Sequence, residues 1–115
     1  MKETVRDSGR LEHILMAIEN VESFLEGKSY EDLCRDKILF FAVVKNIEII
    51  GEAANNITKE LRAKHPEVCW KDVISMRHVL VHDYYNINAR TAWQTSKENL
   101  PQLKALITAI HNELK

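Results

Sequence analysis

The chain has 115 residues and a formal net charge of −1, with 45% hydrophobic residues, three glycines and two prolines. This length is typical of one domain with a real core, and the scarcity of turn-forming residues favours an all-α protein over a β fold. The near-neutral charge excludes an overall positive field that would collect nucleic acid, so RNA binding would need a local site. We expect a single helical domain over residues 1–115.

Targeting signals are missing from the sequence. No apolar run approaches the ~20 residues that span a bilayer, and "MKETVRDSGR" at the N-terminus lacks the apolar core of a signal peptide. We therefore expect a cytoplasmic protein that does not associate with membranes. Cys34 and Cys69 stand apart without CxxC spacing, which is typical of reduced structural thiols.

The first helix is predicted from apolar residues that recur at helical spacing over residues 11–25, with Gly27 as its stop. Ser29 then offers an N-cap, with Asp32 three residues on, for a short helical turn. A long second helix is predicted from about Asp36 to Ala63. Its apolar stripe consists of Phe40, Val43, Ile47, Ile50, Ala54, Ile57 and Leu61.

Three small residues, Gly51, Ala53 and Ala54, lie in the middle of this second helix and would let another helix approach closely. "KHPEV" then ends the pattern, because Pro66 cannot continue a helix. A third helix is predicted from near Trp70 through the segment "RHVLVHDYY", residues 77–85. After the break at "NINAR", Asn88 is the candidate N-cap of a last helix that could be kinked at Pro101. The pattern predicts an up-and-down helical bundle.

A helical wheel of residues 72–85 separates two faces. Val73, Met76, Val79 and Leu80 form a core stripe. The opposite arc is polar, and its members are Arg77, His78, His82 and Tyr85, with Tyr84 at the edge. Ile74 and Val81 fall inside that arc, which suggests that it meets a second copy of the chain in a homodimer. Burial of both faces within one bundle is the alternative.

The polar arc offers chemistry suited to a phosphodiester. His82 could accept or donate a proton near neutral pH, and the planar guanidinium of Arg77 suits a phosphate oxygen. The base would deprotonate a ribose 2′-hydroxyl while the guanidinium stabilises the phosphorane, and a dimer would supply a second histidine as general acid. Spacing alone also allows both residues to be structural.

Other candidate sites have weaker support in the sequence. His78 and His82 have the i,i+4 spacing of metal ligands, but Val79 breaks the HExxH pattern and only Asp83 is near as a third ligand. No metal is therefore expected, and no P-loop, dinucleotide turn or nucleophile elbow predicts a cofactor. The basic stretch "LRAKH", residues 61–65, is flanked by acidic residues and is typical of a solvated face.

"MRHVLVHDYY" resembles the R-x4-H-x-Y motif of HepT-like proteins in the HEPN superfamily, the ribonuclease toxins of toxin–antitoxin pairs. The matching residues are Arg77, His82 and Tyr84. "KNIEIIGEAA" (45–54) resembles the long second helix of that family, and "HPEVCWKDVISMRH" (65–78) resembles the approach to its active site. The resemblance extends from about Leu11 to the C-terminus.

This resemblance implies a homodimer of HEPN-like bundles whose motifs meet across the interface. Arg77 and His82 would be the catalytic pair for metal-independent cleavage of RNA, with no DNA substrate. Tyr84 would be the tyrosine that a cognate nucleotidyltransferase antitoxin adenylylates to silence the toxin. His78 stands where the family often has asparagine, and Glu52 is our conjectured partner for Arg77. A non-catalytic HEPN module that binds nucleotides or the transferase, and a plain helical dimerisation domain, are the alternatives.

Overall fold

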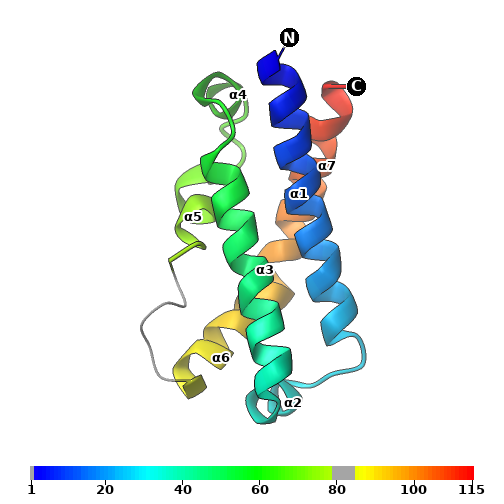
Figure 1. Ribbon diagram of the computed structural model, residues 1–115, viewed down its shortest axis with the longest axis vertical. Coiled ribbons are helices and arrows are strands. Elements are labelled where there is room, and N and C mark those ends of the chain that lie inside the picture. The colour runs from blue at the N-terminus through cyan, green and yellow to red at the C-terminus, as the bar shows by residue number, and fades with distance from the viewer. Residues whose placement is uncertain (1, 79–84) are drawn as a thin grey trace.

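The computed structural model describes residues 2–78 and 85–115, with only the backbone of residues 2–5 and 85–88. This part of the chain is helical and contains no strand, which confirms the all-α prediction (Figure 1). The elements are α1 (Lys2–Leu25), α2 (Tyr30–Arg35), α3 (Lys37–Asn55), α4 (Lys59–Lys64), α5 (Trp70–Ser75), α6 (Tyr85–Gln94), the π-helical turn η1 (Thr95–Asn99) and α7 (Leu100–Glu113).

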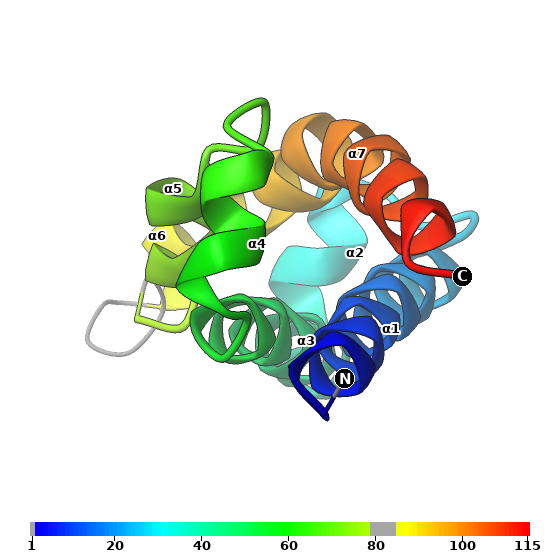
Figure 2. The ribbon, with the colours of Figure 1, turned by 90° about the horizontal axis from the view of Figure 1, so that it is seen from above.

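The long helices run roughly along one axis and enclose the core. α1 packs against α3 and α7, α5 packs against α3, and α2 lies against α6 (Figures 1 and 2). The core is built from the apolar stripes of these helices, including Leu11, Ile14, Ile18, Val43, Ile47, Ile50, Ile107 and Ile110, each no more than 1% exposed. No helix in the described ranges is both long and apolar enough to cross a membrane.

Local signals set the boundaries of the first two helices. α1 ends at Leu25, and Gly27 follows with φ +73°, so the predicted glycine stop is confirmed. Ser29 accepts a hydrogen bond from the Asp32 backbone, and the Asp32 carboxylate accepts one from the Ser29 backbone. This is the predicted capping box. Asp36 caps α3 by accepting from the Leu39 backbone N–H at 3.1 Å.

The predicted single helix from Asp36 to Ala63 is wrong. α3 ends at Asn55, and a new helix, α4, begins after Thr58. A distant residue stabilises this break, because the buried Asp7 of α1 accepts hydrogen bonds from the Thr58 backbone N–H at 2.9 Å and from its hydroxyl at 2.7 Å. Thr58 also accepts from the Leu61 N–H as an N-cap. The tertiary contact therefore overrides a continuous helical pattern.

The third helix is shorter than predicted. α5 ends at Ser75, and i→i−3 backbone bonds close a tight turn over Met76, Arg77 and His78. The predicted helix is therefore wrong from residue 76 to 78, although Val73 and Met76 are buried as the predicted core stripe requires and Arg77 and His78 are more exposed. Residues 79–84 lie outside the described ones. Ile74, which the wheel placed on an open polar face, is half-buried and packs against the core of its own chain. Its position gives no support to an interface there.

The start of the last helix also differs from the prediction. α6 begins at Tyr85, so Asn88 lies inside the helix and does not cap it. Pro101 falls in the first turn of α7, where its missing N–H is tolerated, and the irregularity is the π-helical turn Thr95–Asn99 just before it.

Candidate active site

A close approach between α3 and the turn after α5 builds the candidate site. A Cβ added to Gly51 would lie 2.4 Å from the Arg77 backbone nitrogen and 3.0 Å from the Ile74 carbonyl oxygen. Only glycine leaves room for that backbone. The small residue in the middle of the predicted second helix thus permits close packing, as expected, and it places Arg77 directly beside α3.

The side chain of Arg77 is held by two neighbours. Its Nη1 lies 3.6 Å from Oε2 of Glu52, the residue that follows Gly51 on α3. Its Nε donates to Nε2 of His78 at 3.1 Å. Nε2 of His78 is the acceptor in this contact. The structure therefore brings together three of the five predicted site residues.

Asn56 is a residue that the sequence analysis missed. Its amide donates to the Glu52 backbone carbonyl at 3.0 Å and to Glu52 Oε1 at 3.4 Å. The i,i+4 spacing of Glu52 and Asn56 is a signal that could have found it. Asn56 and Arg77 together restrict the Glu52 carboxylate, so the guanidinium has a fixed partner on α3.

The Arg77–Glu52 pair stays open to solvent. The side chain of Arg77 is 31% exposed and that of Glu52 is 60% exposed. An exposed pair of this kind adds only about 0–1 kcal/mol to stability, so its value lies in orienting the guanidinium. The N–H groups of Arg77 that face solvent remain available to an anionic ligand such as a phosphate. His82 and Tyr84, the other predicted site residues, lie outside the described residues.

An exposed apolar face of α3 leads to this site, and the sequence analysis did not identify it. We define the α3 face as Ile38, Phe41, Lys45, Ile49 and Glu52, which fall within an arc of about 80° on a helical wheel. Ile38 is 84% exposed, Phe41 60% and Ile49 37%. Large apolar side chains that are exposed together on one face mark an interaction surface more often than single exposed ones do.

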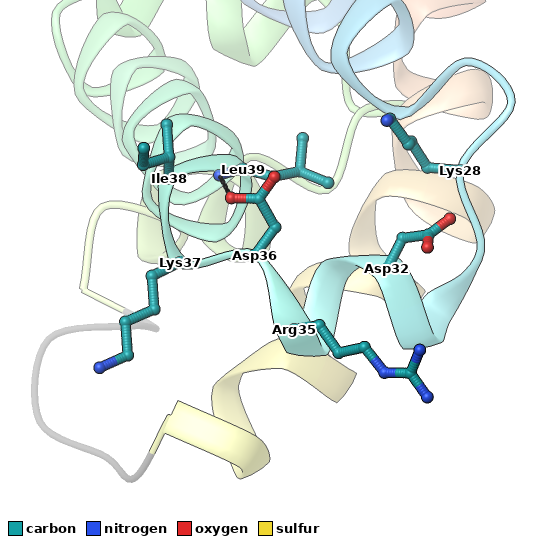
Figure 3. Close-up of a pocket in the computed structure, with 7 residues that line it drawn as sticks. All are labelled: Lys28, Asp32, Arg35, Asp36, Lys37, Ile38 and Leu39. Carbon is teal, nitrogen blue, oxygen red and sulfur yellow. Dashed lines mark hydrogen bonds between the residues drawn. The ribbon is translucent and has the colours of Figure 1, made fainter.

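A separate hollow of about 530 Å³ lies where α2 meets α3 (Figure 3). Its two carboxylates, Asp32 and Asp36, serve as helix caps, and the caps explain their positions. The pKa of Asp32 is lowered, mainly because its carboxylate accepts a hydrogen bond from the Ser29 backbone N–H. Arg35 and Lys37 extend away from each other in Figure 3. These side chains do not converge on a common point, so we assign no chemistry to this hollow.

Metal and thiol chemistry find little support in the described residues. No three of their histidine, cysteine, aspartate and glutamate side chains are placed to hold a metal ion. Cys34 and Cys69 are both free thiols. The Cys69 thiol donates to Oδ2 of Asp72 at 3.1 Å, and this hydrogen bond, with the nearby negative charge, raises the pKa of Cys69. A raised thiol pKa is the opposite of what a cysteine nucleophile needs.

The segment before the site has a structural role. The Trp70 indole donates to the His65 backbone carbonyl at 2.9 Å, and Nδ1 of His65 lies 2.9 Å from Oε2 of Glu67. These contacts fix the chain between α4 and α5 and so set where α5 meets α3. The "HPEVCW" stretch therefore has a structural role: it positions the backbone that leads to Arg77.

Comparisons with known proteins show which family the chain is similar to. The family model described as "Ribonuclease HepT-like" matches residues 14–110. A protein of Caldanaerobacter subterraneus subsp. tengcongensis named "Putative RNase" is 41% identical over 100 residues, covering 87% of this chain and 89% of the relative. A Thermococcus cleftensis protein named "Probable ribonuclease HepT" is 43% identical over 94 residues, covering 82% and 86%.

A third relative, a "Putative RNase" of Methanocaldococcus jannaschii, is 31% identical over 102 residues, covering 89% of this chain and 88% of its own length. No solved structure shows a significant match. The family match covers most of the chain, including the α3 segment with Glu52 and the turn with Arg77. The chain therefore belongs to the ribonuclease HepT-like family of the HEPN superfamily.

Proposed function

We propose that this chain is a metal-independent endoribonuclease, the toxin of a toxin–antitoxin pair, with Arg77 and His82 as its catalytic residues. Membership of a ribonuclease family supports the enzyme class. The observation that carries the residue assignment is the solvent-facing Arg77 guanidinium, oriented by Glu52 on α3.

The proposed reaction uses the ribose of the substrate as nucleophile. His82 takes the proton of a 2′-hydroxyl, and the 2′-oxygen attacks the adjacent phosphorus. Arg77 donates hydrogen bonds to the phosphate oxygens, whose charge increases in the phosphorane. The bond from phosphorus to the 5′-oxygen then breaks, and a general acid gives that oxygen a proton. The products are a 2′,3′-cyclic phosphate and a 5′-hydroxyl, so no water or metal ion enters this step.

The general acid is proposed to be His82 of a second copy, which requires a homodimer with the site at its interface. The α3 face supports this arrangement, because its exposed apolar side chains end at Glu52, the partner of Arg77. A copy that covers Ile38, Phe41 and Ile49 would lie beside the site. This surface replaces the one suggested by Ile74, which packs in its own chain.

Regulation is proposed to act on Tyr84. A cognate nucleotidyltransferase would transfer AMP from ATP to the phenol oxygen, releasing pyrophosphate and the phenol proton. The modification would add a bulky nucleotide and a negative phosphate close in sequence to Arg77. That phosphate could pair with the guanidinium and take the place of the RNA phosphate. The site would then be blocked by charge and by volume.

The decisive experiment measures RNA cleavage by the purified chain in EDTA, with Arg77→Ala and His82→Ala beside it. Each substitution should lower the rate by about 100-fold or more, since each removes a group that acts in the transition state. Lys59→Ala, an exposed lysine on α4, is the matched control and should cleave normally. Cleavage that stops in EDTA and returns with magnesium would contradict the mechanism. Absence of cleavage, with nucleotide or transferase binding intact, would favour a non-catalytic module.

A further inference from the structure

A second pocket, on the helix that follows the motif, has the composition of a nucleotide site. It has a volume of about 300 Å³, lies between α2 and α6, and is lined by Tyr30, Arg90, Trp93 and Gln94. This volume is at the lower limit of ligand pockets, about 300–1,000 Å³, so it suits one base better than a whole cofactor. α2 and α6 lie together at the lower end of the molecule in Figure 1.

The aromatic part of the pocket is a pair of rings. Tyr30 and Trp93 are edge to face, with centroids 6.2 Å apart and planes at 66°. Both side chains are only half-buried, so the pair joins α2 to α6 and still presents ring surface to the pocket. A purely structural pair would explain the contact between the helices but not the hollow beside it.

One cation lines the pocket and a second lies beside it: Arg90 belongs to the lining, whereas Lys97 is outside the lining and contacts the Trp93 ring. Arg90 is exposed, and Nζ of Lys97 lies 4.9 Å from the centroid of the Trp93 ring. Neither cation forms an ion pair with any side chain that the structure describes. A cation over an exposed aromatic ring is held weakly, so a stacked base can displace Lys97 from the ring. The released ammonium would then be available to a phosphate next to that base.

We infer that this pocket binds one base and the adjoining phosphate of the single-stranded RNA substrate. Trp93 and Tyr30 provide the surface for the base, the amide of Gln94 can bond to the base edge, and Arg90 and Lys97 hold the phosphate. Aromatic rings with nearby arginine and lysine are the groups with which proteins bind unpaired RNA. The inference rests on the proposed ribonuclease function and adds a substrate-binding subsite to it.

Covalent geometry places the subsite within reach of the motif. Three residues of chain span at most about 11 Å, which limits the distance between His82 and Tyr85, the first residue of α6. Arg90 lies about 8 Å further along α6. A strand of a few nucleotides can therefore extend from the catalytic histidine to the pocket, since stacked nucleotides advance by about 3.4 Å each.

Trp93 itself reports on occupancy, because the sequence has only two tryptophans. The Trp93 signal is the difference between the fluorescence of the unsubstituted chain and that of Trp93→Phe, so that Trp70 keeps its hydrogen bond to the His65 carbonyl. We would titrate both proteins with a ten-nucleotide single-stranded RNA whose riboses are 2′-O-methylated, which the proposed mechanism cannot cleave. Saturable quenching is expected, because a base stacks on the indole. AMP is the second probe, and it should bind at least tenfold more weakly, since it lacks the strand that continues to the catalytic site.

Substitutions of Arg90 and Lys97 test whether these side chains bind the RNA phosphate. Arg90→Ala and Lys97→Ala should each weaken the quenching titration by about three- to tenfold and raise the KM of cleavage by a similar factor, with kcat little changed. Lys59→Ala, on α4 at the opposite end of the molecule, is the matched control. Trp93→Phe keeps a ring in the fold and should retain binding measured by polarisation of a labelled RNA. Trp93→Leu should weaken it.

The outcomes separate this inference from the proposed function. RNA that binds without changing Trp93 fluorescence, or an Arg90→Ala variant with an unchanged KM, would make the pocket structural only and overturn the subsite. AMP that binds as tightly as the RNA would make it a site for free nucleotides and overturn it as well. Absence of cleavage alongside normal quenching would instead reject the catalytic proposal and leave the RNA-binding pocket supported.

Discussion

Arg77 and Glu52 lie with Nη1 and Oε2 3.6 Å apart, and this pair joins the turn after α5 to the last turn of α3. Its members are 25 positions apart in the chain, and Gly51 brings them together by admitting the Arg77 backbone against α3. The carboxylate thus orients the guanidinium from a rigid helix, while the exposed side of the pair faces solvent. We expect this arrangement to govern how Arg77 meets a phosphate.

Glu52→Gln should separate turnover from binding. The amide cannot orient the guanidinium as the carboxylate does, so kcat for RNA cleavage should fall about five- to tenfold. The KM should stay the same or decrease, because one negative charge that repels the RNA backbone has been removed. Steady-state kinetics on a fluorogenic RNA measure both quantities.

The control for Glu52→Gln is Glu60→Gln, which removes an exposed carboxylate on α4 and should alter neither constant. General structural damage would lower kcat and raise the KM together. That result would contradict a positioning role for Glu52.

Gly51→Ala should destabilise the protein by about 1–3 kcal/mol, because the new Cβ would overlap backbone rather than a movable side chain. Gly9 is the matched control, since it also lies in a helix but has nothing within 4 Å of its added Cβ. Gly9→Ala should stabilise by about 0.5–1 kcal/mol through helix propensity. Urea unfolding monitored by circular dichroism measures both. Equal effects of the two substitutions would mean that the close approach at Gly51 is not a constraint.

The elements that sequence reasoning predicted well are those with local causes. The stop at Gly27, the Ser29–Asp32 capping box and the start of α3 at Asp36 each follow from residues within one turn of the boundary. The core stripes of α1 and α3 follow from helical periodicity and are buried as expected. Such features need no knowledge of the rest of the chain.

The missed features have distant causes. The break after α3 depends on Asp7, which bonds to Thr58 across the bundle. The end of α5 has no breaker residue, and the turn at Arg77 lies where the backbone meets Gly51. Within the candidate site, the sequence motif predicted Arg77, and Glu52 was conjectured, but the resemblance could not reveal that Asn56 holds Glu52. Long-range contacts of this kind leave no periodic signal.

Phe41→Glu combined with Ile49→Glu should produce monomers, because both substitutions place charge on the exposed α3 face proposed to pair with a second copy. Light scattering measures the mass, and circular dichroism should show that helicity is retained. RNA cleavage should fall with the dimer, since the general acid comes from the partner. Met16→Glu, at an equally exposed apolar residue on α1, should leave the dimer intact. A full-strength dimer of the double variant would move the interface elsewhere.

Tyr84 and Tyr85 are the two candidates for the adenylylated residue. The two phenols are neighbours, so composition cannot distinguish them. The R-x4-H-x-Y motif selects the second residue after His82, which is Tyr84, whereas Tyr85 is the first residue of α6. Tyr84→Phe should therefore keep RNA cleavage, because the hydroxyl is not the proposed base, and should escape silencing when the chain is incubated with its nucleotidyltransferase and ATP.

Tyr85→Phe is the matched control, and it should gain the mass of one AMP and lose its ribonuclease activity as the unsubstituted chain does. The loss has a physical reason, since the added phosphate would compete with RNA for the Arg77 guanidinium. Arg77→Ala should accordingly still be adenylylated at Tyr84, because the modification needs the phenol and not the guanidinium. Peptide mapping by mass spectrometry locates the nucleotide. A nucleotide found on Tyr85, or silencing of Tyr84→Phe by modification elsewhere, would refute the assignment.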